Sequence, residues 1–249
     1  MTDFIHMRRA PILDGRLSAA MELAGHPKLF ADIGADHGRL SAVMLLADPE
    51  RRALVADVSA SALSKAQARI GWMGLTDRAV FAVADGLDAL DSLPNERPDV
   101  VFILGMGGDT VSGILRRGSS KLQGAALILG AQTEVPLVRE ALRDIQYHIS
   151  HEVVANENRR DYILIRAENS SASVCYTEEE LLLGPVLLKE YPANWLPILQ
   201  RRERLLLQGL RAMEQTQSTK DAERYRLFRR ELEYVQNALH HYQKEEKPL

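Results

Sequence analysis

The segment from Leu29 to Gly38 constrains the fold of this 249-residue chain more than any other. Its apolar run ends in Asp32, and two glycines, Gly34 and Gly38, come just before a helix-like pattern begins. A strand, a glycine turn and a closely packed helix in this order are typical of a nucleotide-binding α/β unit. The carboxylates of Asp32 and Asp36 would repel a pyrophosphate, so the expected cofactor is cationic or rich in hydroxyl groups. The segment therefore favours S-adenosylmethionine over NAD.

Short aliphatic runs alternate with longer amphipathic stretches from residue 30 to residue 167. This alternation predicts βαβ units and a mostly parallel sheet. We expect helices in the intervals, among them 61–70, which begins with a serine cap candidate, and 135–146. The runs expected to be strands are 29–33, 53–58, 79–84, 100–104 and 125–129. All but the second are apolar enough for a strand that is buried on both faces.

Two further runs, 148–154 and 161–166, are expected to close the sheet as an antiparallel pair that is joined by a polar turn at 156–160. The composition then shifts at the polar stretch 169–173, and the sequence Leu-Gly-Pro at 183–185 predicts another turn. We therefore expect a seven-stranded α/β domain at 1–170 and a second, helical domain at 171–249.

A heptad pattern dominates the last part of the chain, where apolar residues recur at alternating spacings of three and four. A partner helix and a polar turn at 215–220 precede it, which predicts an antiparallel coiled-coil hairpin of two helices of about 24 residues each. The heptad residues are Tyr225, Phe228, Leu232, Val235, Leu239 and Tyr242, and those of the partner helix are Leu199, Leu206, Leu210 and Met213.

The composition limits the class of protein and the kinds of site. No apolar run approaches the roughly 20 residues that span a bilayer, so no membrane partner is expected. The single cysteine, Cys175, excludes an intramolecular disulfide and a thiolate zinc site, and a cytoplasmic location is expected. His148 and His151 fall in an expected strand without companion ligands, so we expect no metal. The formal net charge of −3 argues against unspecific adhesion to nucleic acid but leaves a local basic patch open.

Two acids lie where α/β folds place contacts to a nucleoside. Asp57 follows Gly34 by 23 residues, at the end of the second expected strand, which is the usual place of the acid that binds ribose hydroxyls. Alternatively, Asp57 caps the helix that is entered through Ser59. Asp85, which Gly86 follows, either accepts a hydrogen bond from an adenine amino group or forms a turn.

Three glycines in four residues follow the fourth expected strand, at Gly105-Met106-Gly107-Gly108. They bring the backbone close to whatever lies at the carboxyl end of that strand, which is where open α/β sheets bind their ligands. The alternative is a tight structural loop. The position after the fourth strand and the spacing exclude a dinucleotide fingerprint.

Paired arginines recur along the chain, and most such runs are solvated faces. Where several converge, they could hold a phosphate backbone while the glycine loop presents the reacting base. The pairs are Arg8-Arg9, Arg51-Arg52, Arg116-Arg117, Arg159-Arg160, Arg201-Arg202 and Arg229-Arg230.

Several motifs follow one another along the chain: Arg16-Leu17, Asp32 to His37, Ala84-Asp85-Gly86-Leu87, the loop 105–108, Tyr162, Leu183-Gly184-Pro185 and the closing hairpin. In the order of these motifs the chain resembles the TrmK family of tRNA methyltransferases, which methylate N1 of adenine 22, with Ala35 in place of the family's serine. Two departures accompany the likeness: Asp57 stands where the family usually has glutamate, and Gly130-Ala131-Gln132 stands where it commonly has Gln-Pro-Asn.

The resemblance implies a Rossmann-like domain that binds S-adenosylmethionine and a hairpin that helps to grip tRNA, in a chain for which a monomer is favoured. We expect the wall that faces the substrate to be formed by Asp36, His37, Met106 and Gly107. The expected cofactor-binding residues are Asp32, Gly34, Asp36, His37, Asp57, Val58, Asp85, Gly86, Gly105, Met106 and Gly107.

Two alternatives from other classes stay open at this point. The α/β pattern and Asp57 also suit an NAD-dependent oxidoreductase of the Rossmann type, although the acidic first loop speaks against it. The other alternative is a catalytically inactive α/β domain whose hairpin serves as a scaffold for a partner. Heptads alone do not exclude it.

Overall fold

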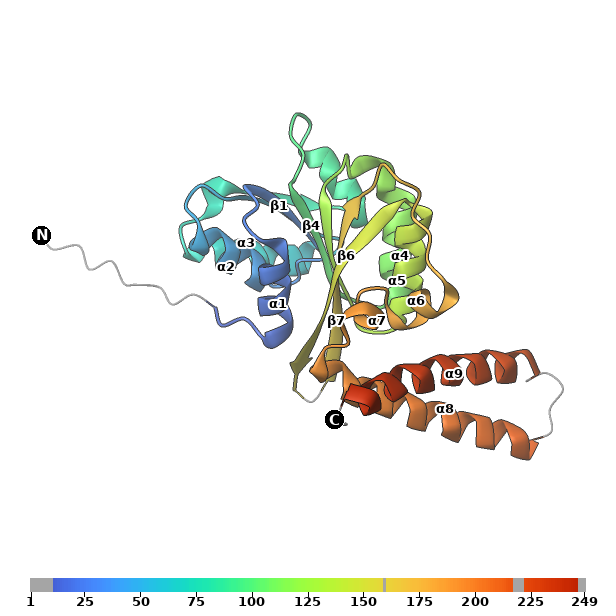
Figure 1. Cartoon of the computed structure of the whole chain (residues 1–249). Helices are drawn as coiled ribbons and strands as arrows, with labels where there is room; N and C mark the ends of the chain where they lie inside the picture. Colours follow the sequence, from blue (N-terminus) through green and yellow to red (C-terminus); the bar gives the residue numbers. More distant parts are fainter. Residues whose placement is uncertain (1–10, 159, 217–221, 246–249) are drawn as a thin grey trace, which may run out of the picture. The chain divides into compact units, whose positions relative to one another are not determined.

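The computed structural model describes residues 11–158, 160–216 and 222–245 (Figure 1). The chain divides into two compact units, Met1–Val174 and Cys175–Leu249, and each is described by itself. Whether 1–170 and 171–249 are independent domains stays a prediction. None of the helices in the described ranges is long and apolar enough to cross a membrane.

Within the described residues, seven strands form one mixed sheet in the order β3-β2-β1-β4-β5-β7-β6. The first five are parallel, and β7 is antiparallel to both β5 and β6. This confirms the predicted α/β class and the antiparallel end. The strands are β1 (Leu29–Ile33), β2 (Arg52–Asp57), β3 (Ala79–Val83), β4 (Val100–Met106), β5 (Ala126–Ala131), β6 (Tyr147–Glu157) and β7 (Arg160–Asn169).

Helices cover both faces of the sheet, with α1, α2 and α3 on one face and α4 and α5 on the other (Figure 1). Polar caps set where two of them begin. The Asp14 carboxylate accepts a hydrogen bond from Leu17 N at the start of α1, and Ser59 Oγ accepts one from Ala62 N at the start of α3. The helices are α1 (Gly15–Ala24), α2 (Arg39–Ala47), α3 (Ala60–Trp72), α4 (Gly108–Gly118) and α5 (Val135–Asp144), with 3-10 turns η1 (Thr76–Arg78), η2 (Gly86–Ser92) and η3 (Ser119–Lys121).

The burial predicted for two strands is wrong. We expected β2 to be the less buried strand and β3 to be buried on both faces. Instead β2 lies between β1 and β3 with Leu54 and Val55 fully buried, whereas β3 is an edge strand on which Val80 and Val83 are exposed. Strand order decides burial here, and composition does not reveal strand order.

The polar turn predicted at 156–160 is also shorter than expected. Both strands continue into it, because Asn156 pairs with Asp161 across the ladder and its side-chain amide donates to the Asp161 carboxylate at 2.8 Å. Cross-strand polar pairs of this kind stabilise a ladder as apolar pairs do. The strands therefore end only at Glu157 and begin again at Arg160.

The core of the first unit lies on both faces of the sheet. Phe30 on β1 and Phe102 on β4 are fully buried and pack edge to face with ring centroids 5.9 Å apart. A buried ion pair joins the Arg139 guanidinium of α5 to the Glu152 carboxylate of β6 at 2.8 Å, so that both charges are compensated.

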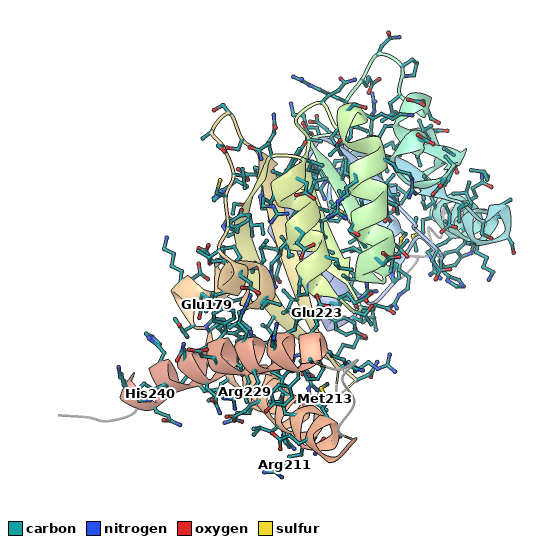
Figure 2. The ribbon with its side chains drawn as sticks, turned by 90° about the vertical axis from the view of Figure 1, so that its right-hand side faces the viewer. Glu179, Arg211, Met213, Glu223, Arg229 and His240 are labelled. Carbon is teal, nitrogen blue, oxygen red and sulfur yellow. The ribbon has the colours of Figure 1, made fainter. Side chains whose placement is uncertain are left out.

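The second unit is helical, and its two long helices pack antiparallel. Arg202 on α8 donates to Glu231 on α9 at 2.5 Å, and Gln236 on α9 donates to Glu203 on α8 at 3.0 Å. Its elements are α6 (Glu178–Leu183), α7 (Leu187–Glu190), η4 (Ala193–Trp195), α8 (Leu196–Thr216) and α9 (Ala222–Glu245). Figure 2 shows Arg211 and Met213 on α8 and Arg229 and His240 on α9.

The buried apolar side chains of α8 and α9 match the predicted heptad positions only in part, because Ala238 is buried whereas Leu239 is only half-buried. The two helices are 21 and 24 residues long, close to the expected length. Most of the predicted turn lies outside the described residues, and the supercoil of a true coiled coil stays a prediction. The buried apolar side chains of this seam are Leu199, Leu206, Leu210, Leu232, Val235 and Ala238.

Candidate active site

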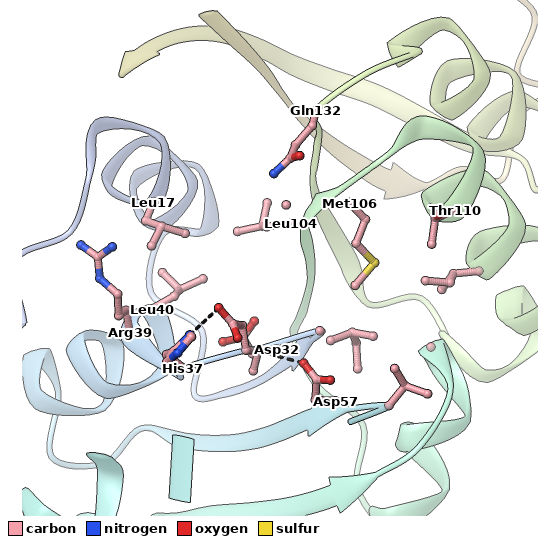
Figure 3. A pocket seen from close by; sticks show the side chains of 18 of the residues that line it. Leu17, Asp32, His37, Arg39, Leu40, Asp57, Leu104, Met106, Thr110 and Gln132 are labelled. Atoms are coloured by element: carbon pink, nitrogen blue, oxygen red, sulfur yellow. Dashed lines mark hydrogen bonds and ion pairs between the residues drawn. The ribbon is translucent and has the colours of Figure 1, made fainter. Parts of the chain in front are cut away.

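A cavity of 480 Å³ opens at the carboxyl ends of the parallel strands (Figure 3). The strand order reverses between β1 and β4, and ligands in open α/β sheets bind at such a switch point. Loops after β1, β2, β3 and β4 and the start of α1 form its walls. The residues singled out from the sequence that line it are Asp32, Gly34, Asp36, His37, Asp57, Val58, Asp85, Gly86, Gly105 and Met106.

The turn after β1 needs glycine at its first position. Gly34 has φ +74°, and a Cβ added there would lie 2.0 Å from Cε of Met106, so the β1 turn and the glycine loop after β4 touch each other. Gly38, with φ +62°, lets α2 approach α3 closely, because a Cβ there would lie 2.8 Å from Cβ of Ala66. The two glycines therefore fix one wall of the cavity.

Asp32 is a buried acid at the end of β1. Its carboxylate accepts a hydrogen bond from Ser41 Oγ at 2.5 Å. Burial raises the pKa of Asp32 to about 6, and the nearby Asp57 carboxylate adds to the rise, while Ser41 and Arg16 oppose it. A cation next to Asp32 would favour its charged form.

Asp57 braces the loop after β1 and does not cap α3. One of its oxygens accepts from Asp36 N at 3.1 Å and the other from Ser59 N at 2.8 Å, whereas Ser59 itself caps the helix. The alternative interpretation of Asp57 as a helix cap is therefore wrong. Its contact with ribose hydroxyls stays a prediction.

Asp36 and His37 form a pair at the rim of the cavity, where Figure 3 labels His37. His37 Nδ1 donates to the Asp36 carboxylate at 2.5 Å, and both side chains are partly exposed. A carboxylate can only accept, so the proton lies on Nδ1, and in the neutral ring Nε2 is left as an acceptor.

The glycine-rich segment 105–108, which runs from the end of β4 to the start of α4, serves two purposes. Gly105, with φ +81°, and Met106 line the cavity. Gly107 does not line it: this residue caps α4, and a Cβ on the next residue, Gly108, would lie 2.2 Å from the carbonyl oxygen of Glu134. The structure thus sets Gly107 apart from the other predicted site residues, and the glycine at 108 serves packing.

Arg16 also lines the cavity, although the sequence analysis noticed it only as part of a family motif and gave it no chemical role. Its guanidinium lies over the Tyr162 ring, 5.6 Å from the centroid, and lines the cavity beside Gly105. The Nη1 atom is buried and has no hydrogen-bond partner among the described residues. A buried donor without a partner is costly, which marks this atom as a contact for an anionic ligand group.

Other lining residues come from elements far apart in the sequence. Gln132, after β5, was noticed only as a departure from a motif. The lining residues that no sequence signal indicated include Asp14, Arg39, Leu40, Thr110 and Ile114. The histidines at 148 and 151 lie on β6 outside this cavity, and in the described ranges no three histidine, cysteine or carboxylate side chains gather as metal ligands.

Comparison with known proteins agrees with this arrangement. The family model described as TrmK, tRNA (adenine(22)-N(1))-methyltransferase, matches residues 30–237. A Mycoplasma pneumoniae protein named as a candidate tRNA methyltransferase is 32% identical over 171 residues, which cover 68% of this chain and 78% of that protein.

Two solved structures have the same fold. The B. subtilis m1A22 tRNA methyltransferase TrmK superposes with a TM-score of 0.81 at 22% identity and covers 92% of this chain and 99% of its own. M. capricolum TrmK, solved with S-adenosylhomocysteine, has a TM-score of 0.78 at 22% identity and covers 92% of this chain and 98% of its own.

Proposed function

This chain belongs to the TrmK family of tRNA (adenine(22)-N(1))-methyltransferases, and we propose that its cavity binds S-adenosylmethionine and presents the methyl group to N1 of adenine 22 in tRNA. The observation that carries the proposal is the charge pattern of the cavity. Its five aspartates suit a cationic ligand, and its one buried, unpartnered guanidinium nitrogen among the described residues suits a carboxylate on that same ligand. S-adenosylmethionine combines a sulfonium, an ammonium and a carboxylate.

Each part of the cofactor has a candidate contact. Arg16 would hold the carboxylate of the amino-acid part, and Asp32 would face its cationic centres. Asp57 would accept from the ribose hydroxyls and Asp85 from the adenine amino group. Gly34, Gly86 and Gly105 have no side chain and would let the backbone approach the cofactor closely, and Val58 and Met106 line the same cavity.

The bound cofactor supplies an electrophilic methyl group on a positively charged sulfur. The N1 lone pair of adenine forms the new N–C bond while the C–S bond breaks, and the electron pair of that bond stays on sulfur. N1 carries no proton at neutral pH, so no general base is required, and orientation of the base supplies the rate enhancement.

The rim pair Asp36 and His37 suits the orientation of the target base. Nε2 of His37 can accept a hydrogen bond from the adenine N6 amino group, which lies next to N1 on the ring. The Asp36 carboxylate, on the other side of the imidazole, would stabilise the positive charge that the ring acquires on methylation. The adenine must leave its stack to reach this rim.

The test is transfer of labelled methyl from S-adenosylmethionine to two tRNA transcripts that differ only in adenine or guanine at position 22. We expect label only in the adenine transcript and its recovery as N1-methyladenosine. Tight binding of S-adenosylhomocysteine without label in either transcript would refute the tRNA substrate. Binding of NADH instead of S-adenosylhomocysteine would support the alternative of an NAD-dependent oxidoreductase, which the family match does not favour.

A further inference from the structure

A second hollow of 340 Å³ lies beside α3, and its charge is opposite to that of the main cavity. Lys65, Arg69 and Trp72 line it together with Pro11 and Met73. None of the described residues that line it is acidic. The three side chains lie at spacings of four and three on α3, so they share one face of the helix.

Hydrogen bonds join this hollow to the proposed active site. Arg69 Nε donates to the carbonyl oxygen of His37 at 2.8 Å, and His37 lines the main cavity. Arg39, which also lines the main cavity, donates to the carbonyl oxygen of Ile12, the neighbour of Pro11. A residue of the α3 hollow is thus hydrogen-bonded directly to a residue of the main cavity.

The main cavity alone is a poor place for a polyanion. The described part of its lining holds five aspartates against Arg16 and Arg39, and the cationic cofactor would offset part of that charge. A phosphodiester chain that delivers a base into this cavity must be held by cations close to the rim.

The cations of α3 and α4 differ in how they are paired. On α4 and the turn after it, Arg116 lies 3.0 Å from Asp144 and Lys121 lies 2.7 Å from Asp88. Among the described residues, neither Lys65 nor Arg69 has such an ion pair. The charge of α3 is thus available to an external anion, whereas that of α4 is largely neutralised within the chain.

We propose that the α3 hollow binds the tRNA backbone next to the target nucleotide, with Lys65 and Arg69 on phosphate oxygens and the indole of Trp72 stacked on an unpaired base. The proposal rests on the proposed function and names the surface that delivers its substrate. Trp72 is 57% exposed, so much of its side chain is accessible to a ligand. Aromatic side chains beside cations are the usual platform for unpaired RNA bases.

The test compares two double variants of equal charge change in the full-length chain with S-adenosylhomocysteine bound. One is Lys65→Gln with Arg69→Gln, and its matched control is Arg116→Gln with Lys121→Gln. We expect the Kd for tRNA, measured by filter binding, to rise about tenfold in the first and less than about twofold in the control. The salt dependence of log Kd should flatten by about 0.7 for each lost phosphate contact.

Trp72 provides an independent readout, because the only other tryptophan, Trp195, is buried. Iodide quenching of the accessible indole should decrease when tRNA binds. Should Arg69→Gln disturb the His37 loop and weaken the cofactor, Lys65→Gln alone decides the question. Equal Kd values for the α3 variant and the control, with wild-type methylation intact, would overturn this inference and leave the proposed function standing. Absence of tRNA methylation by the wild type would refute the proposed function itself.

Discussion

At the scale of single residues, Arg16 stands out because its buried Nη1 has no partner among the described residues. A buried donor without a hydrogen-bond partner lowers the stability of the folded chain, and a ligand that accepts from it removes that cost. Its neighbours explain why it persists: Asp32 lies close enough to interact with its charge, and the Tyr162 ring supports the guanidinium plane. The residue is therefore arranged for binding more than for stability.

Arg16→Met should weaken binding of S-adenosylhomocysteine about 10- to 100-fold, because a charge-assisted hydrogen bond to the carboxylate is lost. Affinity for 5′-methylthioadenosine, which lacks the amino-acid part, should change less than about twofold. Calorimetry with the two ligands measures both. Arg52→Met, an exposed arginine paired with Glu96, is the control. Equal losses for the two ligands would show that Arg16 does not contact the carboxylate.

Asp32 gives a pH dependence of stability whose sign follows from its raised pKa. The unfolded chain releases this proton near the ordinary aspartate pKa of 3.8 and the folded chain near 6, so the folded state binds more protons between these values. The free energy of unfolding therefore falls as the pH rises through this window. At pH values below this window Asp32 is protonated in both states, so the cost of burying its charge is absent.

Asp32→Asn should remove this penalty. Relative to the wild type, the variant should gain about 2 kcal/mol of unfolding free energy between pH 4 and pH 7. Urea unfolding of both proteins at several pH values measures the difference, in which other titrating groups cancel. Parallel pH profiles would contradict a raised pKa at Asp32.

At the scale of elements, the patterns that could be read from the sequence were local ones. The glycines and acids at the ends of β1, β2 and β4 can be identified from the sequence, because strand, turn and helix are adjacent in the chain. The exposure of β3 could not be predicted, because it depends on which strands lie beside it. The same holds for Thr110 on α4 and Arg39 on α2, which reach the cavity only through the arrangement of the helices on the sheet.

Two glycines of α4 should respond to alanine in opposite ways. Gly108→Ala places a Cβ 2.2 Å from a backbone oxygen of residue 134, which cannot move without the β5–α5 loop, so we expect a loss of about 1–3 kcal/mol of unfolding free energy. Gly113→Ala meets only the end of the Arg117 side chain and should be neutral or stabilise by up to about 1 kcal/mol. Thermal and urea unfolding compare them. If Gly108→Ala is neutral, the close packing at the start of α4 is not what requires glycine there.

At the scale of the whole molecule, the two compact units predict a division of labour. Every described residue that lines the main cavity belongs to Met1–Val174, so a chain that ends at Val174 retains all the residues proposed here to bind the cofactor. The helices of the second unit carry exposed arginines such as Arg211 and Arg229, which suit contact with a phosphate backbone. Cofactor binding and grip on tRNA should therefore be separable.

Removal of residues 175–249 should leave the Kd for S-adenosylhomocysteine within about threefold of the full chain, because none of the lining residues that the structure describes is lost. The kcat/KM for tRNA methylation should fall by about 10²-fold or more. Most of this fall should come from a higher KM, because the arginines would bind the ground state and the transition state equally well. Raising the salt concentration should slow methylation by the full chain more steeply than methylation by the truncated one, which separates lost phosphate contacts from misfolding.

Unchanged kcat/KM would show that the first unit alone binds the tRNA. Loss of cofactor binding would show that the first unit depends on the second for its fold, and in that case the predicted independence of the domains would be wrong.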